Sequence, residues 1–179
     1  MTNAKTPSLL NDVRILTLPS AKVASIHRYN AEIPAEYKTN ELLTEFVIKH
    51  DLIRRKPDIR HFGFNHPNGE KADGSDHGYE RWITIPEDLD VTPPFTLKTM
   101  SGGLYAAHRI RMGRFDEWHA LIRWVEQSPD YAIVWGDPAS MGGLLEEHLD
   151  YVDQYRFTQA QIDQQTLLDL LIPVRPLQK

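Results

Sequence analysis

The same order of predicted elements occurs twice along the chain, and this repetition constrains the fold more than any other feature of the sequence. In each half, two β-rich runs precede an amphipathic helix, and further strands follow it. The halves span residues 13–86 and 95–174 and share the order of their elements more than the identity of their residues. We therefore predict an α+β fold of two pseudo-symmetric halves, each an antiparallel sheet with a packed helix, around a central ligand cleft.

In the first half, local signals define one helix and several strands. Pro34 can occupy the first turn of a helix, and apolar residues follow at helical spacing until Pro57 prevents continuation. Residues 65–78 are rich in Asn, Asp, Gly and Pro and are predicted to form a loop. The predicted strands cover residues 13–18, 22–27, 60–64 and 79–85. The first two are joined across Pro19-Ser20, which predicts a hairpin.

The second half repeats this pattern. The predicted strands cover residues 95–100, 104–109, 130–135, 144–149 and 167–174. A Ser-Gly-Gly turn at 101–103 joins the first two, because glycine tolerates positive φ. Apolar residues between 114 and 127 recur at the spacing of an amphipathic helix. Thr158, with Gln161 three residues later, resembles a capping box that opens a short helix.

Charge and hydropathy indicate the class of protein. The net charge of −5 and the lack of a basic stripe argue against direct nucleic-acid binding. No apolar run is long enough to span a membrane, and no signal peptide is evident. We expect a cytoplasmic protein with no membrane partner. Residues 1–12 are predicted to be a flexible arm, residues 13–174 a single domain and residues 175–179 a tail.

The residue types limit the possible chemistry. Cysteine is absent, so disulfides, thiolate catalysis and cysteine-based zinc sites are excluded. His61, His66 and His77 lie in or near one loop, but their spacing matches no metal-binding motif. Phosphate-binding loops and nucleophile elbows are also missing. We therefore predict no metal and no cofactor.

Acidic residues within strands are the candidate functional groups. When the halves are compared, the stretch YERW at 79–82 corresponds to LEEH at 145–148. In this alignment Glu80 matches Glu146, and Trp82 matches His148. Alternation along a strand places Glu80 and Trp82 on one face, and likewise Glu146 and His148. Both carboxylates could therefore point into one cleft.

The last predicted strand adds a third acid, because Asp169 interrupts an apolar run. A carboxylate in an aromatic cleft can bind a cation, with cation–π attraction from the rings. It can also act as a general acid or base with a raised pKa. The third possibility is that backbone N–H groups satisfy it and it has no chemical role. Strand acids are most often exposed to solvent, so a role for Glu80 depends on its relation to Glu146 and Asp169.

Aromatic residues complete the predicted site. The candidate ligand contacts are Tyr79, Trp82, Tyr105 and Trp124, together with His148 and the three acids. Trp82 is the best candidate among them because it shares a strand face with Glu80. Tyr105 could donate its hydroxyl to a ligand or pack in the core, and Trp124 could face the cleft or solvent. Trp118 lies on the apolar stripe of its helix, which favours core packing.

Six short motifs in register resemble the GyrI-like small-molecule-binding domain, also called the bacterial or AraC-type effector-binding domain. The motifs are GFNHP (63–67), GYERW (78–82), GGLYA (102–106), FDEWHALIRWVEQS (115–128), LEEH (145–148) and DLLIPV (169–174). They cover almost the whole of residues 13–174. The resemblance implies two pseudo-symmetric halves around an aromatic cleft with an acidic residue.

The resemblance also implies specific site residues. The usual pocket glutamate of the family falls on Glu146, and the usual aromatic residue two positions later is replaced by His148. Family members fused to transcription regulators carry a preceding helix-turn-helix. Only about 12 residues precede Val13 in this sequence, so we expect no operator binding by that route.

Three functions remain open from the sequence. The first is a stand-alone protein that captures amphipathic, cationic or drug-like compounds, with Glu146 and Glu80 as counter-charges. The second is a hydrolase of strained, cyclopropane-type natural products, with Glu146 as general base and Glu80 as its acid partner. The third is a protein-interaction module of the gyrase-inhibitor type, which the modest net charge supports least.

Overall fold

The computed structural model describes residues 10–29, 33–71 and 75–178. Most of the predicted arm at 1–12 therefore lies outside the described residues. The strands are β1 (Arg14–Leu18), β2 (Ala21–Tyr29), β3 (His61–Asn65), β4 (Gly78–Thr84), β5 (Thr96–Met100), β6 (Gly103–Arg111), β7 (Tyr131–Ile133), β8 (Leu145–His148) and β9 (Leu167–Pro176). The α-helices are α1 (Ala35–Lys49), α2 (Leu52–Arg55), α3 (Trp118–Glu126), α4 (Tyr151–Gln154) and α5 (Gln159–Gln165), with 3-10 turns η1 (Phe115–Glu117) and η2 (Pro138–Gly143).

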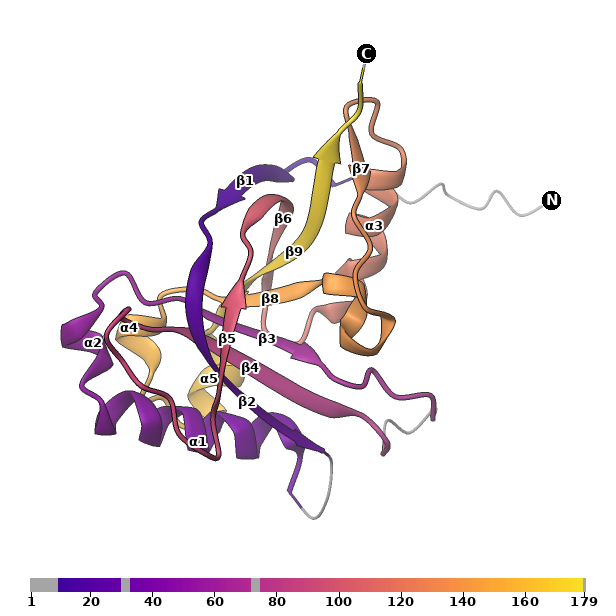
Figure 1. Ribbon diagram of the computed structural model, residues 1–179. Coiled ribbons are helices and arrows are strands. Elements are labelled where there is room, and N and C mark those ends of the chain that lie inside the picture. The colour runs from indigo at the N-terminus through magenta and orange to yellow at the C-terminus, as the bar shows by residue number, and fades with distance from the viewer. Residues whose placement is uncertain (1–9, 30–32, 72–74, 179) are drawn as a thin grey trace.

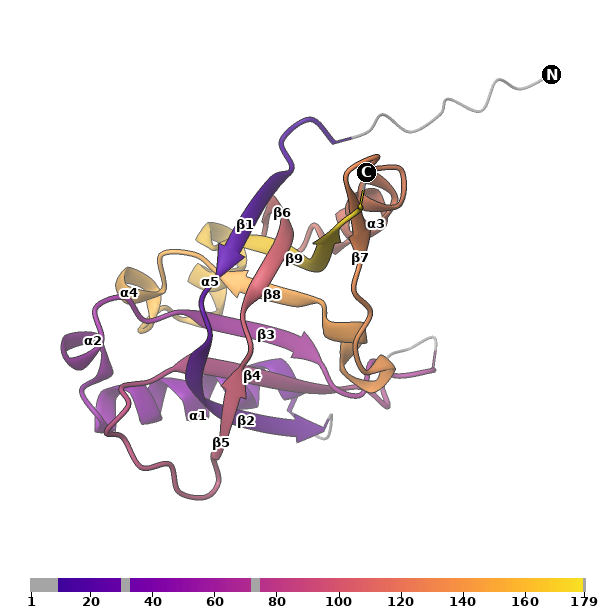
Figure 2. The same cartoon turned by 45° about the horizontal axis from the view of Figure 1, so that its top comes forward.

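A curved antiparallel sheet forms the centre of the molecule (Figures 1 and 2). Its strand order is β1-β6-β9-β8-β3-β4-β2-β5, and β7 pairs with β9 outside this path. The order is symmetric about the boundary between β3 and β8. Across that boundary β3 corresponds to β8, β4 to β9, β2 to β6 and β1 to β5. The predicted α+β fold with two pseudo-symmetric halves is therefore confirmed.

The predicted hairpin between residues 13–18 and 22–27 is wrong. β1 pairs with β6 and β5 pairs with β2, so each half gives its first strand to the sheet edge of the other half. The two connections pack against each other at Gly102, which has φ +72°. A Cβ there would collide with the backbone of Leu18–Ser20, so glycine is required both by conformation and by close approach. The exchange places β1 and β5 at the two edges of the sheet.

Two helices cover the same face of the sheet, which we call the helix face. α1 packs over β2 and β4 with an apolar cluster that includes Leu43, Val47 and Ile83. α3 packs over β6 and β9 with a second cluster, including Leu121 and Leu170. In Figure 1, α1 lies at the bottom and α3 at the upper right, with β3 and β8 between them. A third cluster packs on the other side of the sheet, which we call the opposite face.

Most of the predicted elements are confirmed. The helix after Pro34 is α1, the amphipathic helix at 114–127 is η1 followed by α3, and the later strand predictions correspond to β3, β4, β7, β8 and β9. Thr158 forms the predicted capping box with Gln161 at the start of α5. Within the described parts of the chain, no helix combines the length and apolar character needed to cross a bilayer.

Candidate functional site

A cavity of about 890 Å³ opens on the helix face, where the two halves meet. We call it the central cleft. Strands β4 and β8 form its floor, α1 and α3 its walls, and α5 part of its rim. The lining side chains include Tyr79, Arg81 and Glu146 from the floor, and Glu36, Tyr37 and Trp118 from the walls.

The floor depends on a glycine between two strands. Gly63 on β3 pairs with Arg81 on β4 on one side and with Glu146 on β8 on the other. The Tyr79 ring occupies the space above Gly63, and its hydroxyl donates a 2.6 Å hydrogen bond to Glu146 Oε2. A Cβ at position 63 would overlap the Tyr79 hydroxyl and ring. Gly63 therefore allows Tyr79 to reach across the central strand to the carboxyl of Glu146.

Glu146 is 7% exposed, and its environment changes its acidity. Burial raises its pKa to about 7, because water can no longer solvate the charged form. The Tyr79 hydrogen bond and the Arg81 charge lower the pKa, and the Glu36 charge raises it. The buried indole N–H of Trp118 also lowers it, although this N–H has no hydrogen bond of good geometry among the described residues. Near neutral pH, Glu146 therefore exists in both protonated and ionised forms.

Arg81 is the second charged group of the floor and is 6% exposed. Its guanidinium donates to the hydroxyl of Thr39 and the carbonyl of Glu36, both at 3.1 Å. It also contacts Nε2 of His61 at 3.0 Å and Nε2 of His148 at 3.3 Å. Burial, followed by nearby positive charge, holds the pKa of each histidine well below its ordinary value. Both rings are therefore neutral and accept hydrogen bonds from Arg81.

Glu80 and Trp82, predicted to share the cleft with Glu146, lie on the opposite face. Side chains alternate along β4, and Tyr79 and Arg81 occupy the helix face. The predicted correspondence of YERW with LEEH is also wrong, because the symmetry relates β4 to β9 and β8 to β3. Glu80 instead borders a smaller cavity of about 330 Å³ on the opposite face.

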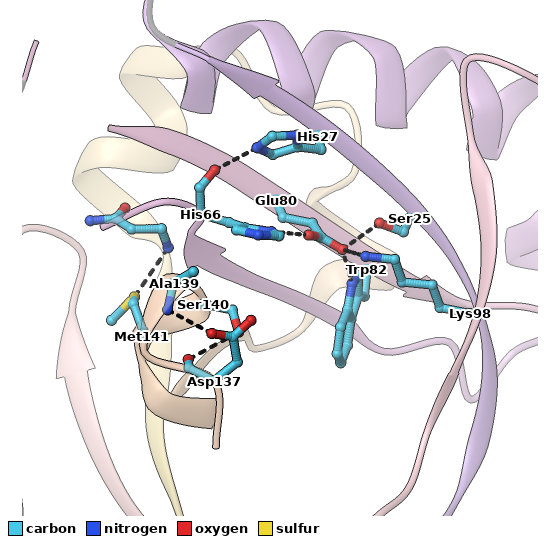
Figure 3. A network of polar contacts seen from close by, with 11 residues as sticks. Ser25, His27, His66, Glu80, Trp82, Lys98, Asp137, Ala139, Ser140 and Met141 are labelled. Atoms are coloured by element: carbon cyan, nitrogen blue, oxygen red, sulfur yellow. Dashed lines mark hydrogen bonds and ion pairs between the residues drawn. The ribbon is translucent and has the colours of Figure 1, made fainter. Parts of the chain in front are cut away.

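A dense network of hydrogen bonds surrounds Glu80 (Figure 3). Its Oε1 accepts from Ser25 at 2.6 Å and from Trp82 and Lys98 at 2.5 Å, and its Oε2 contacts His66 Nδ1 at 2.6 Å. Burial alone would raise the pKa of Glu80, but these bonds outweigh it and lower the pKa to about 2. Glu80 is a fully compensated anion that ties β4 to β2 and β5.

The other acids of the opposite face are also paired with cations. Asp169 on β9 contacts Arg14 at 2.6 Å and Arg109 at 3.3 Å. Glu147, next to Glu146 on β8, binds Arg60 through both oxygens at 2.6 and 2.7 Å. Asp169 lies on β9, which corresponds to β4, the strand of Glu80. Both acids pair with a cation from an edge strand of the sheet.

The remaining predicted residues are divided between the two faces. His148 borders the central cleft beside Arg81, whereas Tyr105 borders the opposite-face cavity. Trp124 packs against the apolar cluster under α3. Trp118, predicted as core, belongs to that cluster and also lines the cleft. Arg81 is not among the residues predicted from the sequence, although alternation along β4 places it on the same face as Tyr79.

Comparison with known proteins places the chain among effector-binding proteins. A family model described as Cass2, integron-associated effector binding protein, matches residues 14–174. No match to a curated protein was found.

Three solved structures share the fold at low sequence identity. EcmrR in its DNA complex has a TM-score of 0.64 at 12% identity, with 92% of this chain and 57% of that chain covered. A protein from Listeria innocua described as a hydrolase has a TM-score of 0.58 at 10% identity, with 94% of each chain covered. SAV2435 bound to tetraphenylphosphonium has a TM-score of 0.50 at 13% identity, with 92% of this chain and 94% of that chain covered.

We predict that Glu80 stabilises the fold in a pH-dependent way. Its pKa is lower in the folded protein than its ordinary value of 4.5, so its contribution is present above pH 4.5 and is lost as the pH falls towards 2. Glu80→Gln should lower the free energy of unfolding by about 3 kcal/mol at pH 7 and by much less at pH 3. Urea denaturation of both proteins at the two pH values measures this.

Glu41→Gln is the control, because Glu41 forms an exposed pair with Lys38 on α1. Its effect should stay below about 0.5 kcal/mol at either pH. An equal loss for Glu80→Gln at pH 7 and pH 3 would contradict the assigned charge state.

Proposed function

The chain belongs to the Cass2 family of integron-associated effector binding proteins and forms a GyrI-like effector-binding domain. We propose that its central cleft captures amphipathic, cationic or drug-like molecules. The observation that carries the proposal is a buried carboxyl at the floor of an aromatic cleft, with no ion-pair partner among the described residues. Glu146 is the carboxyl, and its hydroxyl partner Tyr79 holds it in place. The description of the family as effector-binding supports the recognition of a small molecule.

The dimensions of the cleft suit a small organic ligand. Drug-sized molecules occupy cavities of roughly 300–1,000 Å³ lined mainly by apolar and aromatic groups. The cleft has a volume of about 890 Å³, and Tyr37, Phe115 and Trp118 contribute aromatic faces to its walls. Tyr37 and Phe115 are 46% and 38% exposed, so their rings are accessible at the mouth. These rings can attract a cation before it reaches the floor.

The acidity of Glu146 links binding to protons. A cation beside the carboxyl favours its ionised form, so binding at neutral pH releases the proton that burial had retained. Affinity for a cation should therefore increase with pH up to about 7 and level off above it. The structure of SAV2435 with tetraphenylphosphonium supports the choice of a lipophilic cation as a probe, since that protein has the same fold.

We expect tetraphenylphosphonium to quench tryptophan fluorescence, with an affinity that depends on Glu146. Glu146→Gln should weaken binding at pH 8 by at least ~10-fold, equivalent to about 1.4 kcal/mol. Binding to the wild type should strengthen about tenfold between pH 6 and pH 8, because the ionised fraction of a group with a pKa near 7 rises by that factor.

Glu147→Gln provides the matched control, because Glu147 neighbours Glu146 on β8 but faces away from the cleft. This variant should bind tetraphenylphosphonium as the wild type does. Equal affinity of the wild type and Glu146→Gln, or an affinity that does not change with pH, would exclude Glu146 as the counter-charge.

The raised pKa of Glu146 also supports a second proposed function, hydrolysis, and the family resemblance implies an activated cyclopropane as the substrate class. A carboxylate with a pKa near 7 is suited to act as a general base at neutral pH. Glu146 would take a proton from water as the oxygen attacks the cyclopropane carbon. The strained C–C bond breaks, and the electron pair moves into a dienone whose oxygen is protonated to a phenol.

Turnover of a spirocyclopropyl dienone, followed by its ultraviolet absorbance, tests this second function. The rate should rise with pH with a midpoint near 7, and Glu146→Gln should abolish it. Substrate that remains unchanged after long incubation with excess protein would remove hydrolysis of this class and leave the binding function intact.

A further inference from the structure

The positive charge of Arg81 has no carboxylate partner. Among the described residues, no Asp or Glu oxygen lies within ion-pair distance of its guanidinium, and its bonds go to a hydroxyl, a carbonyl and two imidazole nitrogens. Neither histidine can supply negative charge. A buried guanidinium without a counter-ion costs free energy, because hydrogen bonds replace only part of the lost hydration.

This arrangement contrasts with the rest of the sheet. On the opposite face, each buried acid contacts a cation. The pairs are Glu80 with Lys98, Glu147 with Arg60, and Asp169 with Arg14. These three acids are therefore compensated, whereas Arg81 and Glu146, on the floor of the central cleft, have no ion-pair partner among the described residues. A bound group of opposite charge would offset the free-energy cost of leaving the Arg81 charge unpaired.

Arg81 also has capacity to donate a further hydrogen bond. A guanidinium carries five N–H groups. The four contacts to Thr39, Glu36, His61 and His148 leave one N–H without a bond among the described residues. The indole N–H of Trp118 is directed at Glu146, whose pKa it lowers, so it belongs to that carboxyl. The cleft thus presents a donor at Arg81 as well as the Glu146 carboxyl.

The positions of the two charged residues indicate which groups a matching ligand carries. Arg81 and Glu146 pair with the same residue, Gly63, from opposite sides, so both side chains lie in one cross-strand row of the cleft floor. We infer that the cleft selects zwitterionic amphipathic molecules, whose carboxylate binds at Arg81 and whose cationic group binds at Glu146. The inference rests on the proposed small-molecule function and specifies the class of ligand.

Arg81 also links α1 to the sheet through its bonds to Thr39 and Glu36. This structural role accounts for the bonds but not for the absence of a counter-charge. A test must therefore compare two ligands that differ only in the carboxylate, since loss of scaffold rigidity would weaken both equally.

Rhodamine 19 and its ethyl ester, rhodamine 6G, are suitable probes. They share one cationic xanthene ring system, and only rhodamine 19 carries a free carboxylate. Fluorescence anisotropy at pH 8 should show that the wild-type protein binds rhodamine 19 at least ~10-fold more tightly than rhodamine 6G. Equal or tighter binding of rhodamine 6G would overturn the inference and leave the proposed function standing. Binding of neither dye would contradict both.

The variant Arg81→Gln tests whether the guanidinium causes the preference for rhodamine 19 over rhodamine 6G. The variant should bind the two dyes with similar affinity, and its affinity for rhodamine 6G should be retained or improved because a positive charge has been removed from the cleft. If Arg81→Gln bound both dyes more weakly than the wild type by the same factor, Arg81 would have a structural role alone and the inference would be overturned. Glu147→Gln, on the opposite face, should keep the wild-type preference. The wild-type comparison decides the question even if Arg81→Gln does not fold.

Discussion

The hydrogen bond from Tyr79 to Glu146 across Gly63 is the interaction on which the central cleft depends. It joins β4 to β8 over the central strand β3, so it ties the two halves together at their symmetry axis. The absence of a side chain at position 63 makes room for it. The same geometry buries the carboxyl among aromatic walls, and burial raises the pKa of Glu146 to about 7. One close contact thus sets both the shape of the floor and its chemical state.

The two faces of the sheet differ in whether their buried charges form ion pairs. On the opposite face, carboxylates contact cations from other strands, and the pKa of Glu80 falls to about 2. These pairs hold the exchanged strands β1 and β5 in place, since Arg14 and Lys98 come from those strands. On the helix face, Glu146 and Arg81 lie in one cross-strand row without forming an ion pair among the described residues. The free-energy cost of that arrangement is concentrated where a ligand can relieve it.

The sequence predicted the fold better than it predicted the site. Helical periodicity, the Thr158 capping box and the repeated order of elements are local signals, and the corresponding elements are present. Strand pairing across the symmetry axis is a long-range feature, so the Pro19-Ser20 connection was interpreted as a hairpin. Alternation showed that Glu80 and Trp82 share a face, but which face points to the cleft depends on the pairing of β4 with β3 and on the position of the helices. Arg81 was overlooked for the same reason. Gly63 belongs to the GFNHP motif, but its role depends on the Tyr79 ring above it, which is a tertiary contact that local sequence does not specify.

The most direct test of this account is the pKa of Glu146 in the protein without ligand. The carboxyl carbons of glutamate can be labelled with ¹³C, and the signal of Glu146 identified by its absence in Glu146→Gln. Its chemical shift should titrate with a midpoint near 7, as burial beneath Tyr79 and between α1 and α3 requires. A midpoint near the ordinary value of 4.5 would show that the carboxyl is hydrated or fully compensated. The cleft would then lack the uncompensated acid from which its proposed function follows.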